Sequence, residues 1–207
     1  MSAGGGGLYL IALGSNQRHG RFGPPAAVLG AALRALAEAG CRVLAAAPVV
    51  ASAPVGPSRR VYANGAAVVA CDAAPDVLLA RMKAIEARFG RRCGQRWGTR
   101  VLDLDIVLWS GGRWRSGARS APMRARGAGW GGWLAVPHPA YAGRDFVLGP
   151  AARVAPAWRD PVNGRTVRQL AQGRRSSLSK PRCHLRQSVP SGGSSNRRGA
   201  QPLQQAG

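Results

Sequence analysis

The chain has 207 residues, of which 45% are hydrophobic, so it can bury one ordinary core, and a single domain is the simplest expectation. Its formal net charge of +22 is extreme, and its four cysteines have no C-x-x-C spacing, which argues against a zinc knuckle and a disulfide framework. The N-terminal apolar run is too short for a signal peptide or a membrane span. We therefore expect a cytoplasmic protein with no membrane partner.

The first quarter of the chain predicts a strand, a helix and a second strand. Residues 8–13 form an apolar run that ends at residues 14–16, Gly-Ser-Asn, which favour a turn. Pro24 precedes a helix whose apolar residues recur at helical spacing, and Gly40 ends it. Residues 41–51 then predict the second strand.

A third strand, a second helix and a fourth strand follow. Residues 62–71 predict a strand, and residues 75–90 carry an apolar stripe at helical spacing. Residues 101–109 are β-branched and apolar, which favours a strand, and period-two alternation places Asp103 and Asp105 on one of its faces. The apolar residues of this strand take the other face: Leu102, Leu104, Ile106 and Leu108.

The order strand, helix, strand, strand, helix, strand is typical of a ferredoxin-like α/β sandwich, an α+β fold. Both helices are then expected on one face of an antiparallel sheet. The opposite face stays open, and it presents Asp103 and Asp105. We therefore expect the active site on the open face.

The second half of the chain has weaker patterns. Residues 110–133 are rich in Gly and Arg without periodicity, which predicts a long loop. Order is expected again at 134–139 and 144–148, and 150–156 predicts a short helix or a turn.

The resulting domain organisation has three parts. Residues 1–7 are predicted to be a flexible N-terminus, residues 8–172 the folded domain, and residues 173–207 a disordered, basic, low-complexity tail. Blocks of positive charge associate loosely with polyanions, so we expect nonspecific polyanion association of this tail.

The aspartate pair is the most informative feature, since the chain has only 8 acidic residues. Carboxylates two residues apart on a strand are about 6–7 Å apart, and they repel each other unless a cation lies between them. Oxygen ligands with arginines nearby indicate magnesium with a polyphosphate. The alternative is a solvated strand face whose aspartates have arginines as surface partners.

Several separated segments agree with one family when they are taken together. They are Gly14-Ser15-Asn16, Tyr62-Ala63-Asn64, Gly90-Arg91, Arg96-Trp97-Gly98, Asp103-Leu104-Asp105, Pro137-His138-Pro139 and Arg144-Asp145-Phe146. In this order they resemble 6-hydroxymethyl-7,8-dihydropterin pyrophosphokinase, an enzyme of folate biosynthesis. The run R-W-G-x-R-x-x-D-x-D-I over residues 96–106 is the specific part of the resemblance.

The resemblance implies transfer of the pyrophosphoryl group of ATP to the primary hydroxyl of 6-hydroxymethyl-7,8-dihydropterin, with AMP as the other product. Two Mg²⁺ ions are implied as cofactors, held by Asp103 and Asp105. The implied catalytic residues are Arg91, Arg100, Asp103 and Asp105. The implied ATP-binding residues are Arg91, Trp97, Arg100, His138 and Arg144. The implied pterin-binding residues are Val55, Tyr62, Asn64 and Phe146. We expect a monomer.

Other interpretations remain open at this stage. Tyr62 and Phe146 would each serve as ordinary core aromatics, and His138 between two prolines would serve as a rigid loop residue. The charge is also compatible with an RNA- or ribosome-associated protein on the same frame, although no predicted strand is rich in aromatics as such a protein would require. The third alternative is an inactive family member whose long 110–133 segment and basic tail spoil the site; Cys93 and Thr99 also depart from the family pattern.

Overall fold

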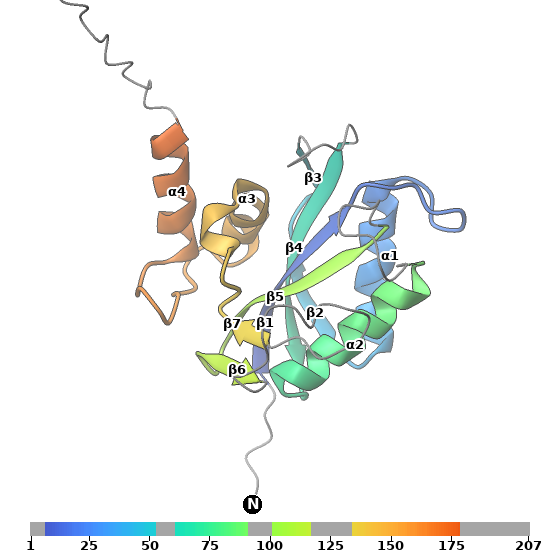
Figure 1. Cartoon of the computed structure of the whole chain (residues 1–207), viewed down its shortest axis with the longest axis horizontal. Helices are drawn as coiled ribbons and strands as arrows, with labels where there is room; N and C mark the ends of the chain where they lie inside the picture. Colours follow the sequence, from blue (N-terminus) through green and yellow to red (C-terminus); the bar gives the residue numbers. More distant parts are fainter. Residues whose placement is uncertain (1–6, 53–60, 91–100, 117–133, 179–207) are drawn as a thin grey trace, which may run out of the picture.

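An antiparallel sheet with helices on both of its faces forms the described part of the chain (Figure 1). The structure, a computed structural model, describes residues 7–52, 61–90, 101–116 and 134–178. Its strands are β1 (Gly7–Ser15), β2 (Arg42–Ala46), β3 (Val50–Ser52), β4 (Tyr62–Cys71), β5 (Asp103–Trp109), β6 (Trp114–Ser116) and β7 (Leu134–Val136). Its helices are α1 (Pro25–Glu38), α2 (Pro75–Arg88), the 3₁₀ turn η1 (Tyr141–Gly143), α3 (Asp145–Val154) and α4 (Val167–Leu178).

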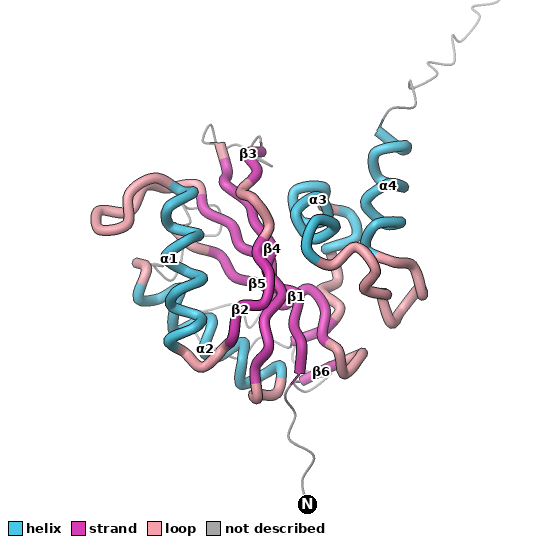
Figure 2. Tube along the Cα trace, turned by 180° about the vertical axis from the view of Figure 1, so that it is seen from behind, coloured by secondary structure: helices cyan, strands magenta, loops and turns pink. Residues whose placement is uncertain are grey.

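The main sheet has the strand order β2-β4-β1-β5, and β3 also pairs with β4. All of its strand pairs are antiparallel, which confirms the α+β class. β1 lies inside the sheet between β4 and β5, whereas β5 is an edge strand (Figure 2). β6 and β7 form a separate two-stranded sheet.

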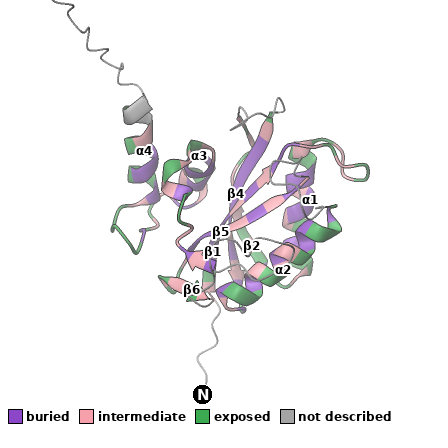
Figure 3. Ribbon diagram, viewed as in Figure 1, coloured by how far each residue is buried: buried purple, intermediate pink, exposed green. Residues whose placement is uncertain are grey.

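Helices α1 and α2 cover one face, as the sequence predicts. Each has Pro at its first position and a glycine with positive φ just after its end, Gly40 at 86° and Gly90 at 84°. The buried side chains of α2 pack on the apolar face of β5, which includes Leu104 and Ile106, and those of α1 pack on β4, β1 and β2. Buried residues of both helices lie toward the sheet, and their exposed residues lie away from it (Figure 3).

The opposite face is only partly open, which modifies the expected two-layer arrangement. α3 packs on β4 and β1, and α4 packs on α3. A second core forms there from the buried side chains Leu10, Ala66, Val107, Leu108, Tyr141, Val147, Leu148, Ala151, Ala155, Val167, Leu170 and Ala171. The site therefore lies on a face that α3 borders.

The described residues contain no helix with the length and apolar character needed to cross a membrane.

A register shift in β5 corrects the predicted position of Leu108. Leu10 pairs with Leu108, but the next residue, Ile11, pairs with Ile106, so Val107 is an extra residue in the ladder. Such a bulge interrupts the alternation of side chains. Leu108 consequently joins the second core with Val107, instead of packing on the face of Ile106.

Three further boundaries differ from the sequence-based expectations. The predicted strand over 41–51 is two strands, β2 and β3, which Pro48 separates because it has no N–H to donate to a ladder. The predicted loop over 110–133 contains strand β6, which pairs with β7; residues 117–133 lie outside the described residues. The segment predicted as a tail begins within α4, which continues to Leu178.

Candidate active site

The centre of the site is a row of three paired residues across the main sheet. Gly14 on β1 pairs with Asn64 on β4 and with Asp103 on β5. Directly opposite residues of neighbouring strands project from the same face, so the amide and the carboxylate stand on either side of a residue without a side chain. A methyl group built at Gly14 would lie 3.8 Å from Asn64 Oδ1 and 4.0 Å from Asp103 Cβ.

A second row repeats this arrangement with Asp105. Ala12 on β1 pairs with Ala66 on β4 and with Asp105 on β5. Both aspartates are partly exposed, while Leu104 between them is fully buried. The predicted alternation of β5 is therefore confirmed at these positions. The structure brings Asn64, Asp103 and Asp105 to one face above a floor of Gly and Ala.

Asn64 is held by a neighbouring strand. Its side chain is 5% exposed, and its Nδ2 donates a hydrogen bond of 2.8 Å to Ser52 Oγ on β3. This bond leaves Oδ1 as the amide atom nearest the Gly14 gap. Tyr62 lies two residues before Asn64 on the same face of β4 and is partly exposed. An acceptor atom and an aromatic ring are thus available to a ligand at this end of the sheet.

The segment after β7 brings His138, Arg144 and Phe146 to this face. His138 N donates to Val107 O at 3.1 Å, which ties this segment to β5 two residues beyond Asp105. The Arg144 guanidinium carbon lies 5.8 Å from the centre of the Phe146 ring, and Phe146 packs against the second core. His138 Nδ1 accepts a hydrogen bond of 3.2 Å from Ala140 N, so a neutral His138 carries its proton on Nε2.

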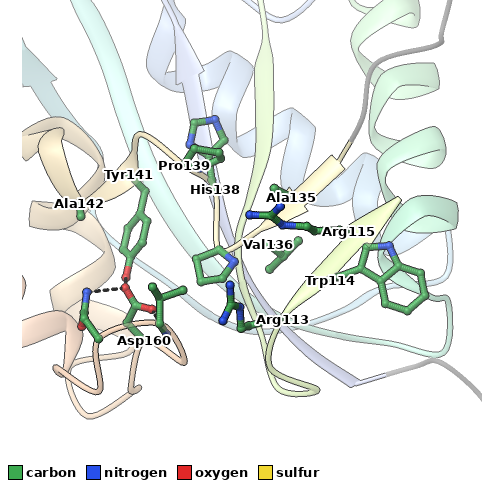
Figure 4. A pocket seen from close by; sticks show the side chains of 13 residues that line it. Arg113, Trp114, Arg115, Ala135, Val136, His138, Pro139, Tyr141, Ala142 and Asp160 are labelled. Carbon is green, nitrogen blue, oxygen red and sulfur yellow. Dashed lines mark hydrogen bonds between the residues drawn. The ribbon is translucent and has the colours of Figure 1, made fainter. Parts of the chain in front are cut away.

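A groove of about 750 Å³ adjoins His138 (Figure 4). Arg113 and Arg115, at strand β6, line one of its sides, and Tyr141 and Asp160 line the other. The sequence shows the two arginines only as part of a charge block. Their place in the groove depends on the pairing of β6 with β7, which no local sequence pattern predicts.

The wall opposite the arginines is a buried polar cluster. Tyr141 Oη donates to Asp160 Oδ2 at 2.8 Å, and Asn163 Nδ2 donates to the same oxygen at 2.8 Å. Val162 N donates to Asp160 Oδ1 at 2.7 Å. Burial, together with the hydrogen bond to Asp160, raises the pKa of Tyr141. The carboxylate of Asp160 is therefore already bound within the protein, and it fixes this wall.

Four predicted site residues lie outside the described residues: Val55, Arg91, Trp97 and Arg100. Within the described residues, no group of three or more His, Cys, Asp or Glu side chains could hold a metal ion. Asp103 and Asp105 are thus a pair of carboxylates without a third such ligand among those residues.

Two carboxylates on one face of an antiparallel α+β frame, with His138 bound to the same strand and a groove lined by two arginines, suit the transfer of a phosphate-containing group. Residues 10–156 match the model of the family described as 7,8-dihydro-6-hydroxymethylpterin-pyrophosphokinase (HPPK). The chain belongs to this family and is a pyrophosphokinase. The resemblance deduced from the sequence is confirmed.

Two curated relatives are similar over most of their length, and both are named 2-amino-4-hydroxy-6-hydroxymethyldihydropteridine pyrophosphokinase. The protein of Synechocystis is 36% identical over 154 residues, which are 74% of this chain and 71% of the relative. The protein of Pseudomonas aeruginosa is 36% identical over 161 residues, which are 77% of this chain and 87% of the relative.

The fold also agrees with a solved structure. HPPK-DHPS of Plasmodium falciparum superposes with a TM-score of 0.65 over 86% of this chain, at 11% identity. The chain spans about half of that longer protein, 46% of its length. At this identity the likeness supports the fold, and the function is argued from the site and the family.

Proposed function

We propose that this chain transfers the pyrophosphoryl group of ATP to the hydroxymethyl group of 6-hydroxymethyl-7,8-dihydropterin, giving AMP and the pterin diphosphate. The observation that carries the proposal is the row Asn64, Gly14 and Asp103 across the sheet. In this proposal Asn64 recognises the heterocycle and Asp103 holds a phosphate-bound cation, and the two residues stand on either side of Gly14.

The pterin is assigned to the Asn64 side of this row. The Asn64 amide supplies an acceptor for the N–H groups of the heterocycle, since Ser52 holds its other end. Tyr62 and Phe146 are the aromatic faces against which a flat ring would stack. The missing side chain at Gly14 leaves room for the hydroxymethyl group to approach Asp103.

Asp103 and Asp105 fit Mg²⁺ because they offer hard oxygen ligands on one face, with no side chain at Gly14 to fill the space beside them. Two ions are proposed, with phosphate and water oxygens completing their coordination. When bound, Mg²⁺ would neutralise charge on the triphosphate and make the β-phosphorus more electrophilic.

Arg144 and His138 are assigned to the phosphates. The pterin hydroxyl oxygen forms a bond to the β-phosphorus and its proton is released to water, while the bond from that phosphorus to the oxygen shared with the α-phosphorus breaks, and AMP leaves. Arg144 offsets the negative charge, and His138 Nε2 donates a hydrogen bond to a phosphate oxygen. Both roles require positioning of the phosphates and no covalent intermediate.

The adenosine end of ATP is assigned to the groove beside His138. A volume of about 750 Å³ lies in the range of small-molecule sites. Arg113 and Arg115 line it and favour the negative charge of the α-phosphate to which the adenosine is joined. The remaining assignments rest on the family pattern alone: Arg91, Trp97 and Arg100 toward ATP, and Val55 toward the pterin. A monomeric, cytoplasmic enzyme remains a prediction.

The decisive experiment is incubation of the full chain with ATP, Mg²⁺ and the hydroxymethyl dihydropterin, followed by separation of the nucleotides. AMP that forms only when the pterin is present supports the proposal. Production of ADP, or no nucleotide product at all, would contradict it, and the second result would favour the inactive-member alternative. The RNA-associated alternative has no support from the family match.

A further inference from the structure

Glu86 on α2 is a carboxylate that is 0% exposed and binds the main chain of β5. Leu104 N donates to Glu86 Oε1 at 2.8 Å. Lys83 Nζ donates to the same Glu86 oxygen at 2.6 Å and to Leu104 O at 3.2 Å. The N–H and the C=O of Leu104 are therefore both bound by one pair of side chains, which we call the Lys83–Glu86 clamp.

The clamp acts on the outer edge of β5. Asp103, Leu104 and Asp105 pair with successive residues of β1, and alternate residues of an antiparallel strand direct their N–H and C=O groups away from their partner strand. For Leu104 these groups point toward α2. Lys83 and Glu86 are three residues apart on α2, so they reach the strand from one helix face.

The ion pair between Lys83 and Glu86 does not by itself account for this arrangement. A buried ion pair contributes little net stability, and apolar side chains of similar size would often be as favourable in the same space. Apolar side chains would leave the N–H and C=O of Leu104 without these partners, at the cost of a buried unpaired polar group. What the clamp adds is a fixed position for the backbone of Leu104.

We propose that Lys83 and Glu86 are positioning residues that fix the direction of the two aspartates, an inference that rests on the proposed function. Leu104 is the chain neighbour of both Asp103 and Asp105, so a shift or rotation of its peptide groups redirects both carboxylates together. The clamp thereby fixes the spacing of the two carboxylates from the side of the sheet opposite the site.

Three variants test this inference. Glu86→Leu keeps the volume and removes the acceptor for Leu104 N–H. Glu86→Gln keeps an acceptor but removes the charge. Ile85→Val is the matched control, because Ile85 is the buried neighbour of Glu86 and this change lowers stability without altering a hydrogen bond. The measurements are amide hydrogen exchange at Leu104 in the ligand-free protein, the midpoint of thermal unfolding, and AMP formation at varied Mg²⁺ and varied pterin.

For Glu86→Leu we expect at least tenfold faster exchange at Leu104 and at least a tenfold higher Mg²⁺ concentration for half-maximal rate, with the KM for pterin nearly unchanged. In Glu86→Gln, the exchange rate at Leu104 and the Mg²⁺ concentration for half-maximal rate should both stay within about threefold of those of the unmodified protein. Ile85→Val should lower only the thermal midpoint. The inference would be overturned if Glu86→Leu had the same Mg²⁺ dependence as the unmodified protein. It would also be overturned if Ile85→Val raised the Mg²⁺ concentration for half-maximal rate as much as Glu86→Leu does.

Two further outcomes keep the test decisive. If Glu86→Leu does not fold, Lys83→Met replaces it, since the Lys83 side chain is 20% exposed and its loss removes the donor to Leu104 O and to Glu86. A Lys83→Met protein with unchanged Leu104 exchange and Mg²⁺ dependence would then overturn the inference. Failure of the unmodified protein to form AMP would contradict the proposed function instead, because exchange at Leu104 is measured without substrate.

Discussion

Asp103 and Asp105 are partly exposed on the face of the site, whereas Asp160 in the groove wall is only 3% exposed. Their carboxylates share a face with Asn64, whereas Asp160 is enclosed by three hydrogen bonds. The site therefore separates two partly exposed carboxylates on the ligand face from a carboxylate that is part of the wall.

Asp103→Asn and Asp105→Asn should each lower the rate of AMP formation on the order of a hundredfold or more, because each removes a negative charge that holds the metal. The thermal midpoint should change little, since both side chains are partly exposed. Steady-state assays at varied Mg²⁺, with thermal unfolding as the control, check this. Unchanged activity at ordinary Mg²⁺ would contradict the metal assignment.

Gly14 permits a sharper test of the pterin pocket. Gly14→Leu should weaken pterin binding by about tenfold or more, because its side chain would fill the space between Asn64 and Asp103. Gly14→Ala is the control, since its methyl group makes only ordinary contacts and Ala in a strand is favoured over Gly by about 0.5–1 kcal/mol. Calorimetric titration with pterin would show equal affinities for the two variants if the pocket lies elsewhere.

The sequence predicts well the elements whose signals lie within the element itself, such as α1 and α2. α1 and α2 have a terminal proline, an apolar stripe and a final glycine, all of which act within one helix. The shared face of Asp103 and Asp105 follows from strand periodicity. The residues that the sequence does not place, such as Arg115 in the groove, depend on the pairing of β6 with β7 across a long stretch of chain. The bulge at Val107 and the covering of the second face likewise depend on contacts between distant segments.

Tyr9 joins β1 to the segment before α2 and makes stability depend on pH. Its Oη donates to Ala73 O at 2.6 Å, and burial, followed by the nearby Cys71, raises the pKa of Tyr9 from 10.0 to about 12. The folded state therefore holds this proton more tightly than the unfolded state. The stabilisation is complete below pH 10.0 and is lost as the pH rises toward about 12.

Tyr9→Phe should consequently lower the free energy of unfolding at neutral pH by about 1 kcal/mol, through loss of the hydrogen bond. Between pH 10 and 12 its stability should fall less steeply than that of the unmodified protein. Urea unfolding over this pH range checks the expectation, and two curves that stay parallel would contradict it.

In the complete chain, α4 is the last helix of the described residues. Arg174 Nε lies 3.2 Å from Asp145 Oδ1, which links α4 to the first turn of α3. Removal of residues 179–207 should leave AMP formation and the thermal midpoint nearly unchanged, because this segment is poor in apolar residues. It should weaken retention on a heparin column, since basic residues are lost.

Removal from residue 173 onward is the matched truncation, because it also deletes Arg174 and the last part of α4. Both truncations remove most of the same charge, so they should elute similarly from heparin. The longer deletion should lower stability by no more than about 1 kcal/mol for the exposed ion pair, in addition to the loss of helix. A shorter deletion that abolishes turnover would show that residues 179–207 complete the site.

The clamp on β5 also bears on association between copies of the chain. An edge strand offers N–H and C=O groups to which another polypeptide can pair, and such edges are a frequent origin of aggregation. At Leu104 these groups are already bound by Lys83 and Glu86, so an incoming strand finds no ladder to extend at this position. The strand that carries the two aspartates can therefore remain an edge strand, with its face open to ligands, while intermolecular β-sheet growth is blocked at Leu104, between the two aspartates.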